Sequence, residues 1–404
     1  MVQRLRGGAS LETAVLQLLR GLPASFWPRP CKRIRQWRET GAGISSHTGA
    51  YNQARQALPL SLVQQSCDRI FEQLAARMDP LGAQDQPRTF LLDGTTLRVS
   101  STPALRQDYP LGSNQHGLSH WPVIRMLVAH DLETGLAMRP QWGPMHGPDA
   151  VSEQGLLELS IGRLPAGSTV IGDANFGVFS VAWAASQSGH PCVLRLTVDR
   201  ARRLAGGSLT DGIDRPLVWK PSRDDRRSHP ELPAEACVTG RLIVRRVEPD
   251  NGDDPFLLAV FTTLSSDWRK VFDLYGRRWT IETDLRTLKS TLCLDRITCT
   301  TPDMVAKEID MSIAAYNLVR AVIGIAAGRS GLAPRGYSFT KARRIVETFG
   351  PLLANAPDPE AAQRAFGQMM TCLNQAKLPK RKRKRPAYPR KIWQRGNGFP
   401  SHKP

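Results

Sequence analysis

The feature that most constrains the fold is a regular alternation of short apolar runs with helix-like segments between residues 88 and 198. Short apolar runs bounded by glycine, proline or aspartate are typical of buried strands. The runs lie at 89–93, 122–130, 135–142, 168–173 and 192–198, and helical periodicity lies at 150–162 and 176–188. Because strands and helices alternate along the chain, the sequence predicts an α/β fold built on a mixed sheet.

The segment from 199 to 264 interrupts this alternation. It is rich in arginine, aspartate, glycine and proline, with strand-like runs at 217–220, 238–247 and 255–263, and we interpret it as an all-β insertion. Helical periodicity returns from residue 267, over 303–327, 339–349 and 358–376 among others. The predicted regions are a helical basic DNA-binding region (1–85), the first part of the core (86–198), the insertion (199–264), a helical region (265–376) and a disordered basic tail (377–404).

The excess positive charge is confined to the two ends of the chain. Of the formal net charge of +19, residues 1–60 carry +7 and residues 377–404 carry +11. A basic tail by itself is typical of a solvated arm. Two basic ends around a near-neutral body favour a polyanionic partner, because each Lys or Arg on a phosphate releases a counterion. Nucleic acid is the partner that we favour. An acidic membrane surface ranks second, because the sequence contains no basic amphipathic helix that would bind one.

The N-terminal basic residues lie in a segment with two possible structures. The sequence predicts a helix over residues 10–20, a glycine- and serine-rich turn at 41–46 and a helix over 48–57. These elements would form either a helix-turn-helix DNA-binding motif or a small helical bundle with a basic face. A further amphipathic helix is predicted over residues 60–77. In either arrangement the predicted DNA contacts are Lys32, Arg33, Arg35 and Arg38.

Cysteine usage and hydropathy indicate a cytoplasmic protein. The seven cysteines are odd in number, irregular in spacing and contain no C-x-x-C pair, as expected of reduced thiols. The longest apolar candidate, residues 311–328, is interrupted by Asn317 and Arg320, so we expect no membrane span. The sequence has no G-x-x-x-x-G-K-[ST] loop, which argues against a nucleotide cofactor.

Two aspartates follow buried apolar runs and are candidate metal ligands. Asp93 ends the run Leu-Leu-Asp-Gly, and Asp173 ends the run Val-Ile-Gly-Asp. Groups at strand ends of an open α/β sheet face a shared crevice, where two carboxylates repel each other unless a cation lies between them. Carboxylate oxygens suit Mg²⁺ or Mn²⁺, although a single strand-end aspartate is also an ordinary turn residue. Glu153 and Glu158 are rival carboxylates that rank lower because neither ends a strand.

The segment 275–289 predicts a helix with an unusual polar face. At 100° per residue, Tyr275, Arg278, Glu282 and Lys289 fall within a stripe of roughly 60°, and Arg286 joins it. A carboxylate flanked by cations and a phenol suits a metal ligand beside phosphate-binding groups. The alternative is a row of surface salt bridges, which are common on helices.

Three other residues of the same helix are assigned from the same angles. Asp284 falls on the opposite side from Glu282, so Asp284 and Arg277 are expected to face solvent. Trp279 lies on a third face and is expected to pack in the core.

The spacing Y-x2-R-x3-E-x6-K, formed by residues 275, 278, 282 and 289, resembles the motif of the insertion-sequence-four family of bacterial DDE transposases. Asp93 in LLDGTT and Asp173 in IGDANF resemble the family's first two acidic positions. The segment RRWTIE at 277–282 is similar to the family's R-W-x-I-E core. The resemblance covers roughly residues 46–390.

This resemblance implies a ribonuclease-H-like mixed-sheet core with the insertion before its Glu-bearing helix. It implies that Asp93, Asp173 and Glu282 are catalytic and hold two Mg²⁺ (or Mn²⁺) ions, about 3.5–4 Å apart in two-metal sites. The implied activity is cut-and-paste transposition of an insertion sequence, with strand cleavage at terminal inverted repeats followed by strand transfer. In the family a tryptophan of the insertion holds a flipped base; Trp219 and Phe256 are possible substitutes here, and the role is assigned to neither.

The resemblance also implies the partners. The predicted DNA contacts near the cut are Tyr275, Arg278, Arg286 and Lys289. Double-stranded DNA held at both ends of the element implies a homodimer, acting at the nucleoid of a bacterial cytoplasm. Two alternatives stay open: a domesticated nuclease on the same core, and a DNA-binding protein without catalysis.

Overall fold

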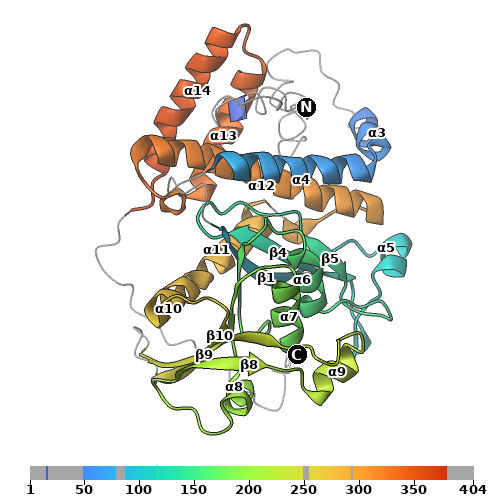
Figure 1. Ribbon diagram of the computed structural model, residues 1–404. Coiled ribbons are helices and arrows are strands. Elements are labelled where there is room, and N and C mark those ends of the chain that lie inside the picture. Colours follow the sequence, from blue (N-terminus) through green and yellow to red (C-terminus); the bar gives the residue numbers. More distant parts are fainter. Residues whose placement is uncertain are drawn as a thin grey trace, which may run out of the picture.

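The computed structural model describes residues 15–16, 49–78, 87–115, 117–248, 254–292 and 294–379. The predicted DNA contacts Lys32, Arg33, Arg35 and Arg38 lie outside the described residues, as do the predicted helix at 10–20 except for residues 15–16 and the basic tail from residue 380. Figure 1 shows one central sheet with helices packed around it and a helical layer above it.

The central sheet has eight strands in the order β5-β4-β1-β6-β7-β10-β9-β8. Strands β4 and β5 extend β1 in antiparallel fashion, whereas β6 and β7 follow on its other side in parallel. This is the strand arrangement of a ribonuclease-H-like core, so the predicted α/β fold is confirmed. The bounds are β1 Thr89–Arg98, β4 Val123–Asp131, β5 Gln141–Pro144, β6 Thr169–Gly172, β7 Cys192–Arg195, β8 Asp214–Trp219, β9 Val238–Val247 and β10 Phe256–Thr262. A separate small sheet pairs β2 (Ser113–Asn114) with β3 (Gly117–Leu118).

Strand β1 is longer than the sequence predicted. It pairs with β4 from Phe90 to Arg98, so Asp93 lies inside the strand and the prediction that it ends the strand is wrong. The reason is that β4 continues to supply hydrogen bonds after β6 has ended at Gly172. Two other predicted strands are shorter: 135–142 is reduced to β5 and one isolated bridge at Ala137, and 192–198 ends at Arg195.

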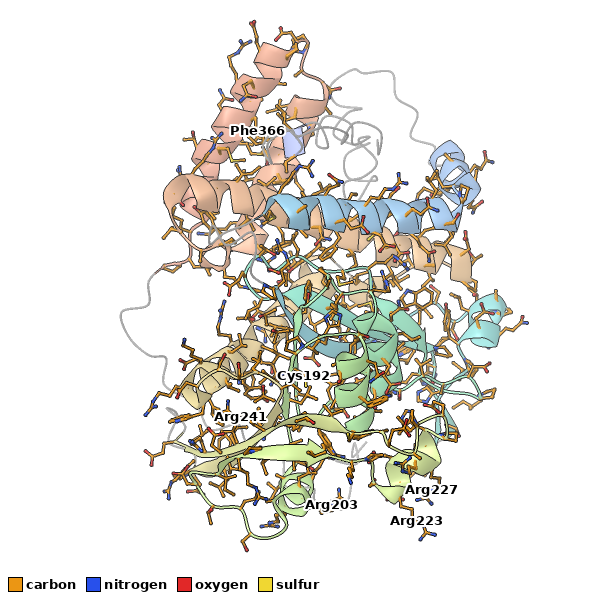
Figure 2. All side chains as sticks on the ribbon, viewed as in Figure 1. Cys192, Arg203, Arg223, Arg227, Arg241 and Phe366 are labelled. Atoms are coloured by element: carbon orange, nitrogen blue, oxygen red, sulfur yellow. The ribbon has the colours of Figure 1, made fainter. Side chains whose placement is uncertain are left out.

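The segment 199–264 extends the central sheet. Strand β10 pairs with β7 in antiparallel fashion, and β9 and β8 follow it. The segment also contains two short helices that the sequence did not predict, α8 (Val198–Ala205) and α9 (Arg223–Ser228). Each has a local cause, because the Thr197 hydroxyl accepts a hydrogen bond from the Arg200 amide and Ser222 forms a capping box with Asp225. Arg203 of α8 and Arg223 and Arg227 of α9 project away from the body of the protein (Figure 2).

The remaining helices surround this sheet. Helices α6 and α7 pack on one another and against strands of the sheet, and α12 lies alongside α4 (Figure 1). The bounds are α3 Gly49–Ala57, α4 Leu60–Arg77, α5 Pro103–Asp108, α6 Glu153–Ile161, α7 Phe179–Gln187, α10 Trp268–Gly276, α11 Thr280–Arg286, α12 Pro302–Ser330, α13 Phe339–Ala354 and α14 Pro359–Leu373. The predicted helices at 48–57 and 60–77 are therefore confirmed.

Helix α12 is long and apolar enough to cross a membrane, but it is mostly buried inside the protein. Asn317, a buried polar residue of this helix, is bonded within the core. The Asn317 side chain accepts a hydrogen bond from the Ala137 amide at 2.8 Å and donates one to the Ala137 carbonyl at 2.7 Å. These properties are those of a core helix.

A buried carboxyl group lies where α12 packs on α4. The Asp310 side chain is 1% exposed, and neither of its oxygens has a hydrogen-bond partner in the described part of the chain. Burial, aided by the nearby charge of Asp68, raises its pKa from 3.8 to about 7, although Arg139 and Arg163 oppose the shift. The folded state therefore retains a proton that the unfolded state releases above pH 4.

We expect Asp310→Asn to stabilise the protein at pH 8 and to have a smaller effect at pH 5. A carboxyl whose pKa is raised on folding contributes less stability as pH rises from about 4 to about 7, because the unfolded state releases its proton first. At pH 8 the substitution removes a buried charge, worth about 1–3 kcal/mol. Urea unfolding of both proteins at the two pH values measures the difference. An equal effect at both pH values would contradict the assignment.

Candidate active site

Asp93 and Asp173 lie on neighbouring segments of the sheet. The parallel pairing of β1 with β6 aligns Leu91 with Ile171, so the same register, two residues further, brings Asp93 opposite Asp173. Adjacent strands are about 4.8 Å apart. Asp93 accepts a hydrogen bond from the Gly94 amide and Asp173 accepts one from the Asn175 amide, both at 2.8 Å. These bonds fix both carboxylates close to the backbone.

The electrostatics of Asp93 are those of a crowded acidic site. Burial raises its pKa from 3.8 to about 6, and the charges of Asp173 and Glu153 add to the increase. The Gly94 amide and the Arg278 guanidinium act in the opposite direction. Three carboxylates, those of Asp93, Asp173 and Glu153, thus interact at this site with the guanidinium of Arg278, an arrangement that a bound cation would neutralise.

The Glu282 side chain comes from a helical segment of irregular geometry. Helix α10 continues into a 3-10 turn (Arg277–Trp279), then into α11, and then into a π-helical turn (Thr287–Thr291). The backbone is helical throughout, but the change of pitch makes the predicted regular stripe only approximate. Arg278 is 8% exposed, and its Nη2 lies 4.0 Å from Glu282 Oε1.

Arg278 and Tyr275 connect this helical segment to the two aspartates. Arg278 interacts electrostatically with Asp93, and Tyr275 interacts with Asp173. Burial raises the pKa of Tyr275, whereas Arg278 and Arg195 lower it. Within the described residues, the Tyr275 hydroxyl and the Arg278 Nε are buried without a hydrogen-bond partner. Tyr275 and Arg278 also interact with one another, so both side chains lie buried next to the carboxylates.

The other two polar motif residues are more open to solvent. Arg286 is exposed, and Lys289 is half-buried. Among the residues described, no group of three His, Cys, Asp or Glu side chains lies close enough to hold a metal ion. Asp93 and Asp173 are brought together, and Glu282 is linked to them through Arg278.

The predicted environments of two residues of this segment are wrong. Asp284 was expected in solvent but is 0% exposed, because Arg320 and Arg335 contact its carboxylate at 2.6 and 2.7 Å. Trp279 was expected in the core but is 58% exposed, beside Arg278. The 3-10 turn at 277–279 changes the rotation per residue, and it is here that the angular prediction fails. Arg277 is exposed as predicted and pairs with Glu133 at 2.6 Å.

The aromatic residues considered for base binding differ in accessibility. Trp219 is 3% exposed and packs edge-on against Phe261, with ring centroids 4.9 Å apart, so a base cannot stack on it. Phe256, at the start of β10, is 42% exposed.

A further carboxylate lies next to the two aspartates, against Gly94 of β1. Glu153, which ranked below Asp173 in the sequence, opens helix α6 and reaches both Gly94 and Asn175. The sequence contained one signal for this placement, because Ser152 is a typical N-cap residue and fixes Glu153 in the first turn.

Comparison with known proteins places this geometry in a family. The family model for the Transposase DDE domain matches residues 84–318, more than half of the chain. The chain is 25% identical over 324 residues to the transposase InsG of insertion sequence element IS4 from Escherichia coli (strain K12), covering 77% of this chain and 68% of that protein. The cryo-EM structure of the piggyBac transposase synaptic complex with hairpin DNA aligns with a TM-score of 0.42 and 12% identity, over 79% of this chain and 63% of that one. The family match covers the strands that carry Asp93 and Asp173 and the helical segment that carries Glu282, and the chain therefore belongs to the DDE transposases of the IS4 type.

Proposed function

We propose that this protein is a DNA transposase that moves an insertion sequence by a cut-and-paste mechanism, with Asp93, Asp173 and Glu282 as its catalytic carboxylates. The observation that carries the proposal is the pairing register that sets Asp93 opposite Asp173, with Arg278 interacting with Asp93 and lying 4.0 Å from Glu282. Three acidic residues from distant parts of the chain are thus connected, Asp173 through Asp93 and Glu282 through Arg278.

The donor set suits a hard divalent cation. Asp93, Asp173 and Glu282 would hold two Mg²⁺ or Mn²⁺ ions, since all three offer carboxylate oxygens and the surplus negative charge at Asp93 would be neutralised on binding. Bound there, the ions would activate water and stabilise the attacking and leaving oxygens of an in-line displacement at phosphorus.

The remaining motif residues would bind the DNA backbone. The Tyr275 hydroxyl and the Arg278 guanidinium would contact phosphate oxygens next to the carboxylates. Lys289 and the exposed Arg286 lie further along the same helical segment and would neutralise adjacent phosphates. These contacts would orient the scissile phosphate toward Asp93 and Asp173.

The organisation of the chain follows from this activity. Residues 1–85 would bind the terminal inverted repeat. The catalytic core would consist of residues 86–198 and 265–376, with the insertion of residues 199–264 between them. The basic tail of 377–404 would add affinity for DNA of any sequence. A homodimer would hold both ends of the element, in the cytoplasm of a bacterium at its nucleoid. No nucleotide cofactor would take part.

A cleavage assay on the DNA that flanks the gene tests this function. We expect the protein to cut at the end of the element only when Mn²⁺ or Mg²⁺ is present, and to join a pre-cut 3′ end to a second duplex. Binding without metal-dependent cleavage would indicate a DNA-binding protein. Cleavage without joining of the pre-cut end would indicate a nuclease.

A further inference from the structure

We propose that Glu153 is a positioning residue that holds Asp173 in place through Asn175; the inference rests on the proposed function, in which Asp173 is a cation ligand. Glu153 Oε2 accepts a hydrogen bond from Asn175 Nδ2 at 2.5 Å. The backbone N–H of Asn175 in turn donates to Asp173 Oδ1 at 2.8 Å. Asn175 therefore connects the first turn of α6, through its side chain, to the Asp173 carboxylate, through its backbone.

The neighbouring residue of α6 strengthens this link. Gln154 Nε2 donates to both the Oδ1 and the carbonyl oxygen of Asn175, each at 2.9 Å. Glu153 thus orients the amide group of the Asn175 side chain, and Gln154 holds its oxygen side. The start of α6 is itself fixed, because the Ser152 hydroxyl accepts a hydrogen bond from the Gly155 amide at 2.9 Å.

The second oxygen of Glu153 lies against β1 directly after Asp93. A Cβ atom at Gly94 would approach Glu153 Oε1 to 2.5 Å, and its three nearest neighbours would all belong to the Glu153 side chain. Gly94 does not have a positive φ, so the need for glycine here is one of space. Since side chains alternate along a strand, Glu153 approaches β1 from the face opposite to the Asp93 side chain.

Glu153 therefore contacts both segments that carry the catalytic aspartates. Its Oε1 side rests on β1 beside Asp93, and its Oε2 side holds the turn that follows β6. Residues that orient metal ligands in this way typically change metal affinity or activity by 10–100-fold when they are replaced. We expect a similar effect here, because replacing Glu153 removes the hydrogen bond that ties the Asn175 side chain, and with it the turn that carries Asp173, to α6.

Direct Mn²⁺ binding to the full chain tests the assignment without relying on activity. Free Mn²⁺ is measured by electron paramagnetic resonance during titration of the wild type and of Glu153→Ala, Glu153→Gln and Glu158→Ala. We expect Glu153→Ala to bind about tenfold more weakly or worse. Glu153→Gln should stay within about threefold of the wild type, because its amide oxygen can still accept the Asn175 hydrogen bond. Glu158→Ala removes the same charge about 7.5 Å further along α6 and should bind like the wild type.

Two outcomes of this titration overturn the inference. The first is wild-type affinity in Glu153→Ala. The second is a Glu153→Gln variant as weak as Glu153→Ala, because the charge of Glu153 and not its hydrogen bond would then matter. Thermal melting of each variant shows that it is folded, and Asp173→Asn reports on the proposed function separately. If Asp173→Asn binds Mn²⁺ like the wild type, the proposed metal site and this inference are both wrong. If Asp173→Asn loses Mn²⁺ binding but Glu153→Ala does not, only the inference about Glu153 is wrong.

Gly94→Ala supplies an independent test by steric means. The added methyl group should push the Glu153 carboxylate away from Asn175 at little cost in stability, since a flexible side chain can move aside. We expect Mn²⁺ affinity to fall about as far as in Glu153→Ala, on the order of tenfold. In a protein that already carries Glu153→Ala the methyl group has room, so adding Gly94→Ala should not lower the Mn²⁺ affinity further. If the double variant loses as much binding free energy as the two single variants together, the proposal is wrong.

Discussion

Replacing Asp93 or Asp173 with asparagine, or Glu282 with glutamine, is expected to abolish strand cleavage while leaving binding to the transposon end nearly intact. Each amide keeps the size of the carboxylate but removes one negative charge and one cation ligand. Metal ions stabilise the transition state of phosphoryl transfer by several kcal/mol, so the rate should fall by about 10³-fold or more.

End binding should survive because it depends on other contacts. Its affinity comes mainly from basic residues on phosphates, and removal of a carboxylate does not weaken those contacts. Binding by the variants should therefore stay within about twofold of the wild type, or become slightly tighter as repulsion from the DNA decreases. A gel-shift titration and a cleavage assay on the same labelled end measure the two properties side by side.

Asp273→Asn is the matched control for these variants. Asp273 is an exposed aspartate of α10, close in sequence to the motif residues, and its replacement changes the net charge by the same amount. It should cut like the wild type. If any of the three carboxylate variants also cuts normally, that residue does not belong to the active site.

The elements that the sequence predicted well are those with local causes. The two parallel strands β6 and β7 are short runs buried in the sheet, and α4 has one apolar face with Val63, Cys67 and Leu74 buried. The meeting of Asp93 and Asp173 was also predictable, because both aspartates come directly after apolar runs, and these runs become neighbouring parallel strands of the sheet.

The elements that were missed depend on partners distant in the sequence. Strand β10 joins the central sheet by pairing with β7 some 60 residues earlier, which no local pattern of residues 256–262 indicates. The extension of β1 past Asp93 depends on β4 in the same way. The core position predicted for Trp279 from a regular helix is wrong, because the sequence gives no sign of the 3-10 turn at 277–279.

The burial of Asp284 has the largest structural consequence among these differences. Its Oδ1 accepts hydrogen bonds from Arg320 Nη2 at 2.6 Å and from the Tyr316 hydroxyl at 3.2 Å. Arg335 Nη1 contacts both carboxylate oxygens, at 2.9 and 2.7 Å. Arg320 and Arg335 lie 36 and 51 positions after Asp284, so the segment 275–289 alone offers no reason to bury a charge.

This network ties the Glu282 helix to the rest of the core. Arg335 also donates from Nε to the Leu132 carbonyl at 2.8 Å and from Nη2 to the Asp131 carbonyl at 3.1 Å, at the end of β4. Arg320 and Tyr316 belong to α12 and are joined by a hydrogen bond of 2.9 Å. Asp284 is therefore the point at which α11, α12 and the end of β4 meet, two residues after Glu282.

Asp284→Ala is expected to destabilise the protein by about 3–5 kcal/mol, the cost of leaving buried charges without their partner. Both guanidinium groups would remain in place, with side chains 5% and 18% exposed. Urea unfolding at pH 7 measures the loss. The exposed pair of Asp224 with Arg227, each side chain 77% exposed, is the control, and Asp224→Ala should change the free energy of unfolding by less than about 1 kcal/mol.

The pH dependence of unfolding gives a second measure of the same network. Burial alone would raise the pKa of Asp284, but Arg320, His130 and Arg335 lower it below 3.8. A lowered carboxyl pKa contributes stability that is present above pH 4 and is lost as pH falls through the folded-state value. Asp284→Ala should therefore cost less stability at pH 3 than at pH 7, when both proteins are folded at both pH values. Two results would contradict this account: a loss below about 1 kcal/mol at pH 7, or an equal loss at both pH values. Either result would show that the paired charge of Asp284 does not hold α11 against the core. The position of Glu282 would then need another explanation.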